Sequence, residues 1–346
     1  MSETNKKLVT GNEAAVLGAI AGGAEIMFGY PITPATEILQ NWAAKSLDNS
    51  SLSYLQTEDE TAAGFCVNGA LLAGVKAFTA SAGPGHILLQ DPISMAEMER
   101  LPFVGIMMQR GGPSTGTVNF SQQEVNLASF GGNGDGLRVV YSASSVHEMY
   151  TLTTKAFSTA WKFRFPTFVL GDGYLGKTEM LIELPKLLKP VPAYKILKEN
   201  AAAPTYLRNC YSDEESFGSV LDENIKDWKK SKHAIAESES YKLSGINELI
   251  IAHGIVAEAC KDAIDKMLTR NKKIGLWRPI TLNPIDSASL IAAAKKVRKI
   301  HIFESALNQF ARIIKYELAG LKLDIIEHGK PARGFTPEEI IEEIMQ

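Results

Sequence analysis

Glu60 is an acidic residue whose neighbours along the chain are small. It is followed by Thr, Ala, Ala and Gly at positions 61–64, which would let another molecule approach the carboxylate closely. A partly buried carboxylate that hydrogen-bonds a ring nitrogen can exchange a proton with that ring, so Glu60 could carry a proton. A structural role is the alternative, because Thr57 and Glu60 have the spacing of a capping box at the start of a helix. The residues themselves leave both interpretations open.

Arg110 ends an apolar segment and begins a glycine-rich turn at positions 111–116. An unpaired guanidinium is costly to bury, so Arg110 either returns to solvent or holds an anion, and its planar fork suits a carboxylate. Thr33, followed by Pro34, has the pattern of a helix cap with proline at the first helical position. Its hydroxyl and the helix-end amides could help to bind the same anion, or Thr33 could be a cap alone.

Two other motifs resemble binding sites only in part. The loop at positions 111–117 has the glycines of a phosphate cradle but lacks the Gly-Lys-Ser/Thr ending of a P-loop, so nucleotide hydrolysis is not expected. Gly-Asp-Gly at positions 171–173 precedes Asn200 by 26 intervening residues, a spacing that thiamine diphosphate enzymes use to hold magnesium and diphosphate. Asn200 follows the prolines of a linker and has no strand before it, so we interpret this match as accidental.

The histidines and cysteines do not form a metal-binding pattern. Cys66, Cys210 and Cys260 are too few and too far apart for a disulfide framework, a zinc site or a four-thiolate iron-sulfur cluster, so such a cluster would belong to another chain. None of the six histidines has zinc-ligand spacing. We place only His86 near a site, and loosely, because it adjoins a glycine turn at positions 83–85.

The composition excludes several classes of partner. The chain has 36 basic and 39 acidic side chains, and its formal charge of −3 provides no broad positive field for nucleic acid or an anionic membrane. No apolar run approaches the roughly 18 residues that span a bilayer. The small-residue run at positions 14–24 follows Glu13, so we expect a core helix rather than a signal peptide there. The expected compartment is a reducing cytoplasm.

Alternating strands and helices must position these residues. Short β-rich segments separated by helix-like segments predict a mainly parallel, doubly wound α/β sheet with helices on both faces. Ligands gather at the carboxyl ends of strands in such sheets, so the turns at positions 30–34, 81–85 and 110–116 should lie together. Capping boxes are expected at positions 57–60 and 145–148. The expected strands are 25–30, 52–56, 75–80, 103–109, 137–141 and 167–170.

The second half of the chain predicts a linker and a smaller α/β domain. Four prolines between positions 185 and 204 precede a polar, helix-like segment at 213–232, which we expect to be exposed. A length of 346 residues favours two domains. We divide the chain into a first domain (1–185), a partly helical linker (186–244) and a second domain (245–346). In the second domain, strands are expected at 249–252, 274–277, 300–303 and 323–326, and helices near 256–268, 288–297 and 309–318.

Four motifs of the first half match one family when they are taken together. They are Tyr30-Pro31-Ile32-Thr33-Pro34, Glu58-Asp59-Glu60, Ser81-Ala82-Gly83-Pro84-Gly85 and Arg110-Gly111-Gly112-Pro113-Ser114-Thr115-Gly116. In this order and spacing they closely resemble the alpha subunit of 2-oxoacid:ferredoxin oxidoreductases. The likeness covers nearly the whole chain, including positions 276–282 and 304–309. It implies a pyrimidine-type thiamine diphosphate-binding domain followed by a smaller transketolase C-terminal-like α/β domain.

The resemblance also implies a reaction and the partners it needs. The reaction would be oxidative decarboxylation of a 2-oxoacid with coenzyme A, giving an acyl-CoA, carbon dioxide and reduced ferredoxin. Thiamine diphosphate would be shared with a beta subunit that holds the diphosphate and Mg2+. The 4Fe-4S clusters would lie on partner subunits, which in some members include gamma and delta subunits.

The same resemblance assigns roles to residues of the four motifs. Glu60 matches the glutamate that hydrogen-bonds the pyrimidine ring and favours the imino tautomer that deprotonates the thiazolium carbon. Arg110 and Thr33 match positions that meet the substrate carboxylate. The expected cofactor-binding residues are Pro31, Ile32, Glu60, Gly83 and Pro84, and no metal ligand is expected on this chain.

The sequence does not decide which 2-oxoacid is the substrate. Positions 81–85 and 110–116 look like the 2-oxoglutarate enzymes, whereas positions 170–176 and 277–282 look like the branched-chain 2-oxoacid enzymes. A second substrate carboxylate would need another cation, and the candidates for it are Lys76, Arg100 and Arg138.

Other functions also stay open. Asn133, in the sequence Gly-Asn-Gly-Asp at positions 132–135, stands where the family often has histidine. One alternative is a subunit of a non-redox or lipoamide-linked thiamine diphosphate enzyme. The other is a non-catalytic scaffold subunit that keeps the fold without the chemistry.

Overall fold

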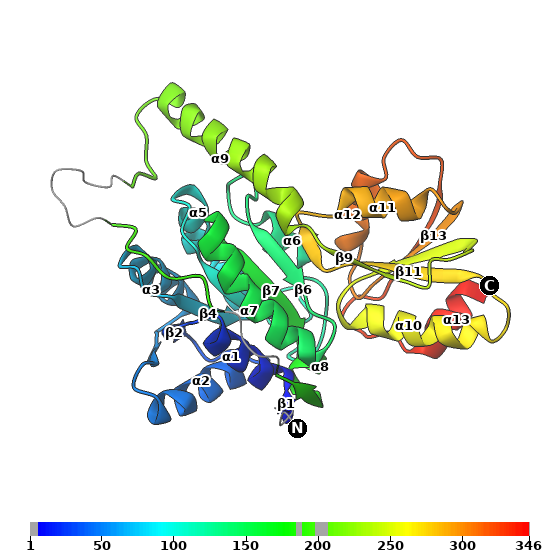
Figure 1. Cartoon of the computed structure of the whole chain (residues 1–346), viewed down its shortest axis with the longest axis horizontal. Helices are drawn as coiled ribbons and strands as arrows, with labels where there is room; N and C mark the ends of the chain where they lie inside the picture. Colours follow the sequence, from blue (N-terminus) through cyan, green and yellow to red (C-terminus); the bar gives the residue numbers. More distant parts are fainter. Residues whose placement is uncertain (1–5, 185–188, 198–206, 346) are drawn as a thin grey trace.

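The computed structural model describes residues 6–184, 189–197 and 207–345, so Asn200 lies outside the described residues (Figure 1). The strands of the larger sheet are β2 (Ile26–Gly29), β3 (Ser53–Gln56), β4 (Ala77–Ser81), β5 (Val104–Gln109), β6 (Val139–Ser142), β7 (Thr167–Asp172) and β12 (Thr281–Asn283). Their order is β12-β6-β7-β5-β4-β2-β3. All neighbours are parallel except β12 and β6. The predicted, mainly parallel sheet is therefore confirmed.

Both faces of this sheet are covered by helices. One layer contains α1 (Gly11–Ala21), α2 (Thr36–Asp48) and α7 (Val146–Phe163), and the other contains α3 (Glu60–Leu72) and α5 (Gln90–Met98). Phe78 packs in the core cluster of the first layer, whereas Ala77, its neighbour on the same strand, packs in that of the second. Successive side chains of one strand thus enter opposite layers, as in other parallel sheets buried on both faces.

Two predicted helix starts are wrong in detail. Thr33 is not a cap, because the chain makes a turn there and α2 begins at Thr36 after Ala35, whose side chain makes no capping bond. At positions 57–60 the cap is Asp59, whose carboxylate accepts from the Ala62 N–H at 2.7 Å. Thr57 instead donates its hydroxyl to the Asp59 carbonyl oxygen, which leaves the Glu60 carboxylate outside the cap.

Two other helix predictions are confirmed. α7 starts at the expected place, with the Ser145 hydroxyl accepting from the Glu148 N–H, but the predicted capping box is incomplete because the Glu148 carboxylate accepts from the Ser144 N–H instead of the Ser145 N–H. The core helix expected after Glu13 is α1, which begins with a capping box between Thr10 and Glu13. The antiparallel pair of β1 (Lys6–Thr10) and β8 (Glu179–Glu183), which joins segments far apart in the sequence, was not predicted.

A smaller sheet lies in the second half of the chain. Its strands are β9 (Ser238–Tyr241), β10 (Glu248–Ala252), β11 (Ile274–Pro279), β13 (Lys299–Glu304) and β14 (Asp324–Gly329), and its helices are α10 (Gly254–Leu268), α11 (Ser287–Ala294), α12 (Phe310–Glu317) and α13 (Pro337–Met345). The order is β14-β13-β10-β11-β9, and only β9 is antiparallel to its neighbour. The four strands and three helices predicted here are confirmed, while β9 and α13 were missed.

The linker contains the predicted exposed helix, α9 (Glu214–Ile235), which runs along the top of the molecule in Figure 1. Two short strands cross the division proposed from the sequence. β9 lies within the expected linker but joins the smaller sheet, and β12 lies within the expected second domain but joins the larger one. The division at positions 185 and 244 therefore stays a prediction. None of the helices in the described part of the chain combines the length and apolar character that crossing a bilayer requires.

Candidate functional site

Three strand ends bring the predicted motifs together. β2, β4 and β5 are neighbours and run parallel, so the turns that follow them lie at one edge of the sheet. These turns carry Thr33, Gly83 and Arg110, respectively. Glu60 joins them as the first residue of α3, which follows the adjacent strand β3. The site expected from the sequence is thus assembled at the carboxyl ends of the strands, as the fold rule requires.

Glu60 is buried and incompletely paired. Its side chain is 4% exposed, and its Oε1 atom has no hydrogen-bond partner among the described residues. A Cβ atom at Gly85 would lie 2.1 Å from that oxygen, so only glycine leaves room for the carboxylate. Burial raises the pKa of Glu60, and Asp59 raises it further, while the Glu60 backbone N–H, Arg110 and the Ser81 hydroxyl oppose the shift. The carboxylate therefore does not form the predicted capping box with Thr57.

Arg110 is also buried, with 5% of its surface exposed. Its Nη1 atom donates to the carbonyl oxygen of Thr33 at 2.8 Å, and its Nε atom has no partner among the described residues. Gly83 has φ +51° and a Cβ there would lie 2.6 Å from Nε, so this turn needs glycine for both its backbone and its packing. Arg110 and Thr33 are thus joined, although through the Thr33 carbonyl and not through its hydroxyl.

The other expected cofactor-binding residues lie on the same turns. Pro31 is exposed, and Ile32 is half-buried in the turn after β2. Pro84 is half-buried and begins the short helix α4 (Pro84–Leu88). They lie on the same turns as Thr33 and Gly83, and their role toward a cofactor stays a prediction.

Glu124 belongs to this group of residues and was not predicted from the sequence. It is 4% exposed, and its carboxylate accepts from the backbone N–H groups of Gly83 and Arg110, both at 2.9 Å. It also lies 2.8 Å from Nδ1 of His86, which is fully buried. His86, expected only loosely near a site, therefore adjoins the Gly83 turn through this carboxylate. Glu124 sits in an irregular segment just before α6 (Val125–Phe130), where no sequence pattern marks it.

Other candidates lie elsewhere or have structural roles. Asp172 caps α8 (Gly173–Lys177) by accepting from two backbone N–H groups, and burial raises its pKa to about 7. The cation candidates Lys76, Arg100 and Arg138 each precede a strand, at the sheet edge opposite Arg110. Lys76 donates to the Gly22 carbonyl, and Arg100 donates to the carbonyls of Phe163 and Arg164. Arg138 pairs with Glu97.

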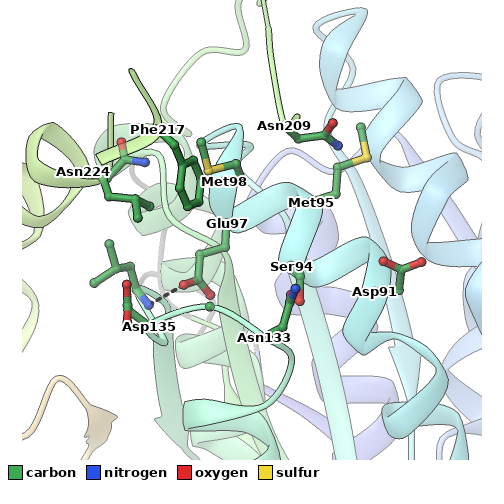
Figure 2. A pocket seen from close by; sticks show the side chains of 13 residues that line it. Asp91, Ser94, Met95, Glu97, Met98, Asn133, Asp135, Asn209, Phe217 and Asn224 are labelled. Atoms are coloured by element: carbon green, nitrogen blue, oxygen red, sulfur yellow. Dashed lines mark hydrogen bonds between the residues drawn. The ribbon is translucent and has the colours of Figure 1, made fainter. Parts of the chain in front are cut away.

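None of the predicted site residues lines a cavity of about 320 Å³ that Figure 2 shows. Its walls come from α5, from the loop that contains Asn133 and Asp135, and from the linker side chains Asn209 and Phe217. Figure 2 shows Glu97 at this cavity, where its carboxylate accepts from the Leu137 N–H. Asn133 therefore lies in a cavity that does not include Glu60, Thr33 or Arg110. Within the described ranges, no group of three or more His, Cys, Asp or Glu side chains could hold a metal ion.

Comparisons with known proteins match both halves of the chain. Residues 17–235 match the family described as pyruvate flavodoxin/ferredoxin oxidoreductase, thiamine diphosphate-binding, and residues 247–332 match pyruvate:ferredoxin oxidoreductase core domain II. Ketoisovalerate oxidoreductase subunit VorB of Methanothermobacter marburgensis is 32% identical over 290 residues, which cover 81% of each protein. 2-oxoglutarate synthase subunit KorA of Methanocaldococcus jannaschii is 30% identical over 330 residues, covering 88% of this chain and 89% of the relative.

Solved structures agree with the sequence matches. A 2-oxoglutarate:ferredoxin oxidoreductase from Magnetococcus marinus, with 2-oxoglutarate, coenzyme A and succinyl-CoA bound, superposes with a TM-score of 0.86 and 26% identity. The match covers the whole of this chain, which spans 66% of the length of that protein's chain. A split-gene transketolase has a TM-score of 0.60 at 11% identity, which supports the fold alone.

Proposed function

The chain belongs to the pyruvate flavodoxin/ferredoxin oxidoreductase family, and from that premise we propose that it is the alpha-type subunit of a 2-oxoacid:ferredoxin oxidoreductase. The reaction is the oxidative decarboxylation of a 2-oxoacid with coenzyme A, giving an acyl-CoA, carbon dioxide and reduced ferredoxin. The observation that carries this proposal is a buried carboxylate oxygen on Glu60 that has no partner among the described residues, close enough to Arg110 for the guanidinium to oppose the rise in the pKa of Glu60.

The residues present fit thiamine diphosphate. The Oε1 atom of Glu60 has no polar partner among the described residues, and the missing Cβ of Gly85 leaves the room that this carboxylate occupies. A nitrogen of the aminopyrimidine ring would satisfy this oxygen, with Pro31, Ile32, Gly83 and Pro84 on the bordering turns. When bound, thiamine diphosphate supplies the carbanion stabilisation that decarboxylation of a 2-oxoacid requires.

The residues of this chain would then have two roles: one shares a proton with the cofactor, and the others bind the substrate carboxylate. Burial favours the protonated form of Glu60, so its carboxyl group can share a proton with the ring nitrogen. Arg110 has one Nη atom bonded to the Thr33 carbonyl and an Nε–H without a partner among the described residues, which can donate to a substrate carboxylate. The Thr33 carbonyl holds the guanidinium in place for that contact.

The partner subunit would complete the site. Exposed apolar side chains lie on the elements around Glu60, and such surface is expected where another protein docks. We assign this face to a beta subunit that holds the diphosphate and Mg2+, with 4Fe-4S clusters on partner subunits. The exposed side chains are Tyr30, Tyr54, Leu55, Phe65, Ile87 and Leu88.

The substrate we favour is a 2-oxoacid with an uncharged side chain. A second carboxylate, as in 2-oxoglutarate, would need another cation beside Arg110. Lys76, Arg100 and Arg138 lie at the opposite sheet edge and are engaged there. Rates with 2-oxoisovalerate and 2-oxoglutarate test this choice, and a preference for 2-oxoglutarate would mean that a partner subunit supplies the cation.

The function is tested on the complex purified from the native host. We expect a companion chain with a Gly-Asp-Gly and Asn motif, cluster cysteines on it or another subunit, and reduction of ferredoxin or viologen that needs both 2-oxoacid and coenzyme A. Transfer to lipoamide instead would favour the lipoamide-linked alternative. Normal turnover after combined loss of Glu60, Arg110 and Thr33 would favour the scaffold alternative.

We also propose that the complex works in the cytoplasm. Cys66, Cys210 and Cys260 are all free thiols, which is usual where glutathione and thioredoxin keep cysteines reduced. Fractionation of native cells, with the chain detected by antibody, tests the compartment, and recovery from an extracellular fraction would contradict it.

A further inference from the structure

One carboxylate connects the two turns that form the candidate site. Oε1 of Glu124 accepts from the N–H of Gly83, in the turn after β4, and from the N–H of Arg110, in the turn after β5. The Gly83 turn continues to Gly85, which packs directly against Oε1 of Glu60. A single side chain thus sets the spacing between the backbone that carries Arg110 and the backbone that shapes the space around Glu60.

The contacts of Glu124 are buried and specific. Its second oxygen, Oε2, lies 2.8 Å from Nδ1 of His86, and the His86 side chain is fully buried. As a hydrogen-bond donor, Nδ1–H of His86 satisfies this second oxygen. A buried carboxylate is costly unless it is hydrogen-bonded, and Glu124 has three donors. Nothing in the proposed chemistry of Glu60 and Arg110 accounts for this arrangement.

The second half of the chain holds the segment that carries Glu124. Gln122 donates to the His253 carbonyl at 2.8 Å and accepts from the Ser305 N–H at 2.9 Å. Gln123 follows Gln122 in the chain, and its carbonyl oxygen accepts a hydrogen bond from the side chain of Gln309 at 2.7 Å. The position of Glu124 is therefore fixed from both sheets, and the smaller one contributes to the geometry of a site whose predicted residues lie on the larger one.

We infer that Glu124 is a positioning residue for the substrate carboxylate, acting through the backbone of Arg110 and Gly83, and that His86 fixes its carboxylate. This inference rests on the proposed function of Arg110. The role is geometric: what matters is an acceptor of the length of glutamate, with its oxygen between two N–H groups, and not the negative charge itself. A shorter side chain cannot reach both groups at once, whereas an uncharged amide of equal length can.

The test compares three substitutions in the assembled complex, with viologen reduction measured against 2-oxoacid concentration. Glu124→Gln keeps the acceptor oxygen and the length, so we expect a KM within about threefold of the unsubstituted complex. Glu124→Asp keeps the charge but shortens the side chain, and Glu124→Ala removes the acceptor. We expect KM to rise at least tenfold in Glu124→Ala. The KM of Glu124→Asp should lie between those of the Ala and Gln variants, and kcat should change less than KM in each variant.

The order of the three KM values separates positioning from other roles. A purely electrostatic role would leave Glu124→Asp closer to normal than Glu124→Gln, and a purely structural role would lower the amount of folded complex without changing KM. Either result overturns the inference, as does failure of both the Asp and Ala variants to assemble. Glu99→Gln is the matched control, since it replaces a buried glutamate at the opposite sheet edge.

Arg110→Ala, measured in parallel, distinguishes this inference from the proposed function. If Arg110→Ala raises KM and the Glu124 variants do not, only the positioning role of Glu124 is wrong. If Arg110→Ala also leaves KM unchanged, the assignment of the carboxylate site itself is wrong.

Discussion

Two buried arginines lie at opposite edges of the larger sheet. Arg138 immediately precedes β6, and its three guanidinium nitrogens all donate to Glu97 or Gln90. Arg110 follows β5, and its side chain donates one hydrogen bond to the described residues, to a carbonyl, while Nε has no partner among them. An incompletely paired buried charge costs free energy of folding. The comparison therefore separates a guanidinium whose nitrogens are all paired from one that keeps an N–H without a partner in the described part of the chain, as a ligand-binding arginine would.

The glutamates near these arginines differ in the same way. Glu97 accepts from the Leu137 N–H through one oxygen and from Arg138 through the other. Glu60 has one oxygen with no partner in the described part of the chain, and burial raises its pKa. Perturbed and unsatisfied groups gather at functional sites, so Glu60 is the one of these two glutamates that is expected to do chemistry.

Glu60→Gln should have the largest effect on activity. If Glu60 shares a proton with the cofactor ring, 2-oxoacid-dependent electron transfer should fall by about 100- to 10,000-fold, the range for loss of a general acid-base group. The measurement is steady-state viologen reduction by the purified complex, which should assemble normally. Glu58→Gln, at an exposed neighbouring position, is the control, and unchanged turnover in Glu60→Gln would remove Glu60 from the mechanism.

Glu97→Ala should have the largest effect on stability. It leaves the Arg138 guanidinium buried without its carboxylate, and breaking such a pair typically costs about 3 to 5 kcal/mol. Urea denaturation of the full chain measures the change in free energy of unfolding. The KM for 2-oxoacid in the folded complex should stay the same. A loss of less than about 1 kcal/mol in the free energy of unfolding would contradict the stabilising role of the Glu97–Arg138 pair. A change in KM would mean that this pair also affects substrate binding.

Arg110→Ala should have an intermediate effect, confined to substrate binding. Loss of a charge-assisted pair with the substrate carboxylate, worth about 1.5 to 3 kcal/mol, should raise KM by roughly 10- to 150-fold. Arg110→Lys should recover only part of this, because an ammonium group cannot reproduce the planar fork. Titration of 2-oxoacid at saturating coenzyme A measures both variants, and a normal KM in Arg110→Ala contradicts the role.

The meeting of the motifs was predictable from the sequence because it depends on local patterns. β-rich segments alternate with helices, which specifies a parallel sheet, and the carboxyl ends of its neighbouring strands share an edge. The approach of Glu60, Thr33 and Arg110 follows from that rule without any knowledge of side-chain packing. His86 lies beside the Gly83 turn because it follows it in the sequence, and its link to that turn through Glu124 was not predicted.

Details that depend on long-range contacts were not predictable. Glu124 is separated from Gly83 by 41 residues and lies in an irregular segment, so no periodicity marks its carboxylate. The cap at position 59 was missed because Thr57 and Asp59 both have side chains that can cap, and the structure alone selects Asp59. The short strands β9 and β12 pair antiparallel at the ends of sheets formed by other segments, which local composition does not specify.

The pH dependence of the free energy of unfolding should show the smallest effect. It tests whether burial of the Glu60 carboxylate lowers the stability of the folded chain. Burial raises the folded-state pKa of Glu60 above its unfolded value, so between those two values the folded chain binds more protons than the unfolded chain. The free energy of unfolding contributed by Glu60 therefore falls as pH rises through this window. Glutamine does not titrate, so Glu60→Gln should gain stability relative to the unsubstituted chain at pH 8 and lose that gain near pH 4.

Urea denaturation of the full chain at both pH values measures this difference. Glu58→Gln should stay within about 0.5 kcal/mol of the unsubstituted chain at each pH, because its side chain is exposed. A gain for Glu60→Gln that is larger at pH 4 than at pH 8 would have the wrong sign for a buried carboxylate. It would mean that the Glu60 carboxylate is hydrogen-bonded more completely in the folded chain than its Oε1 atom indicates. Burial of Glu60 would then not lower the free energy of unfolding, and the two edges of the sheet would not differ in this respect.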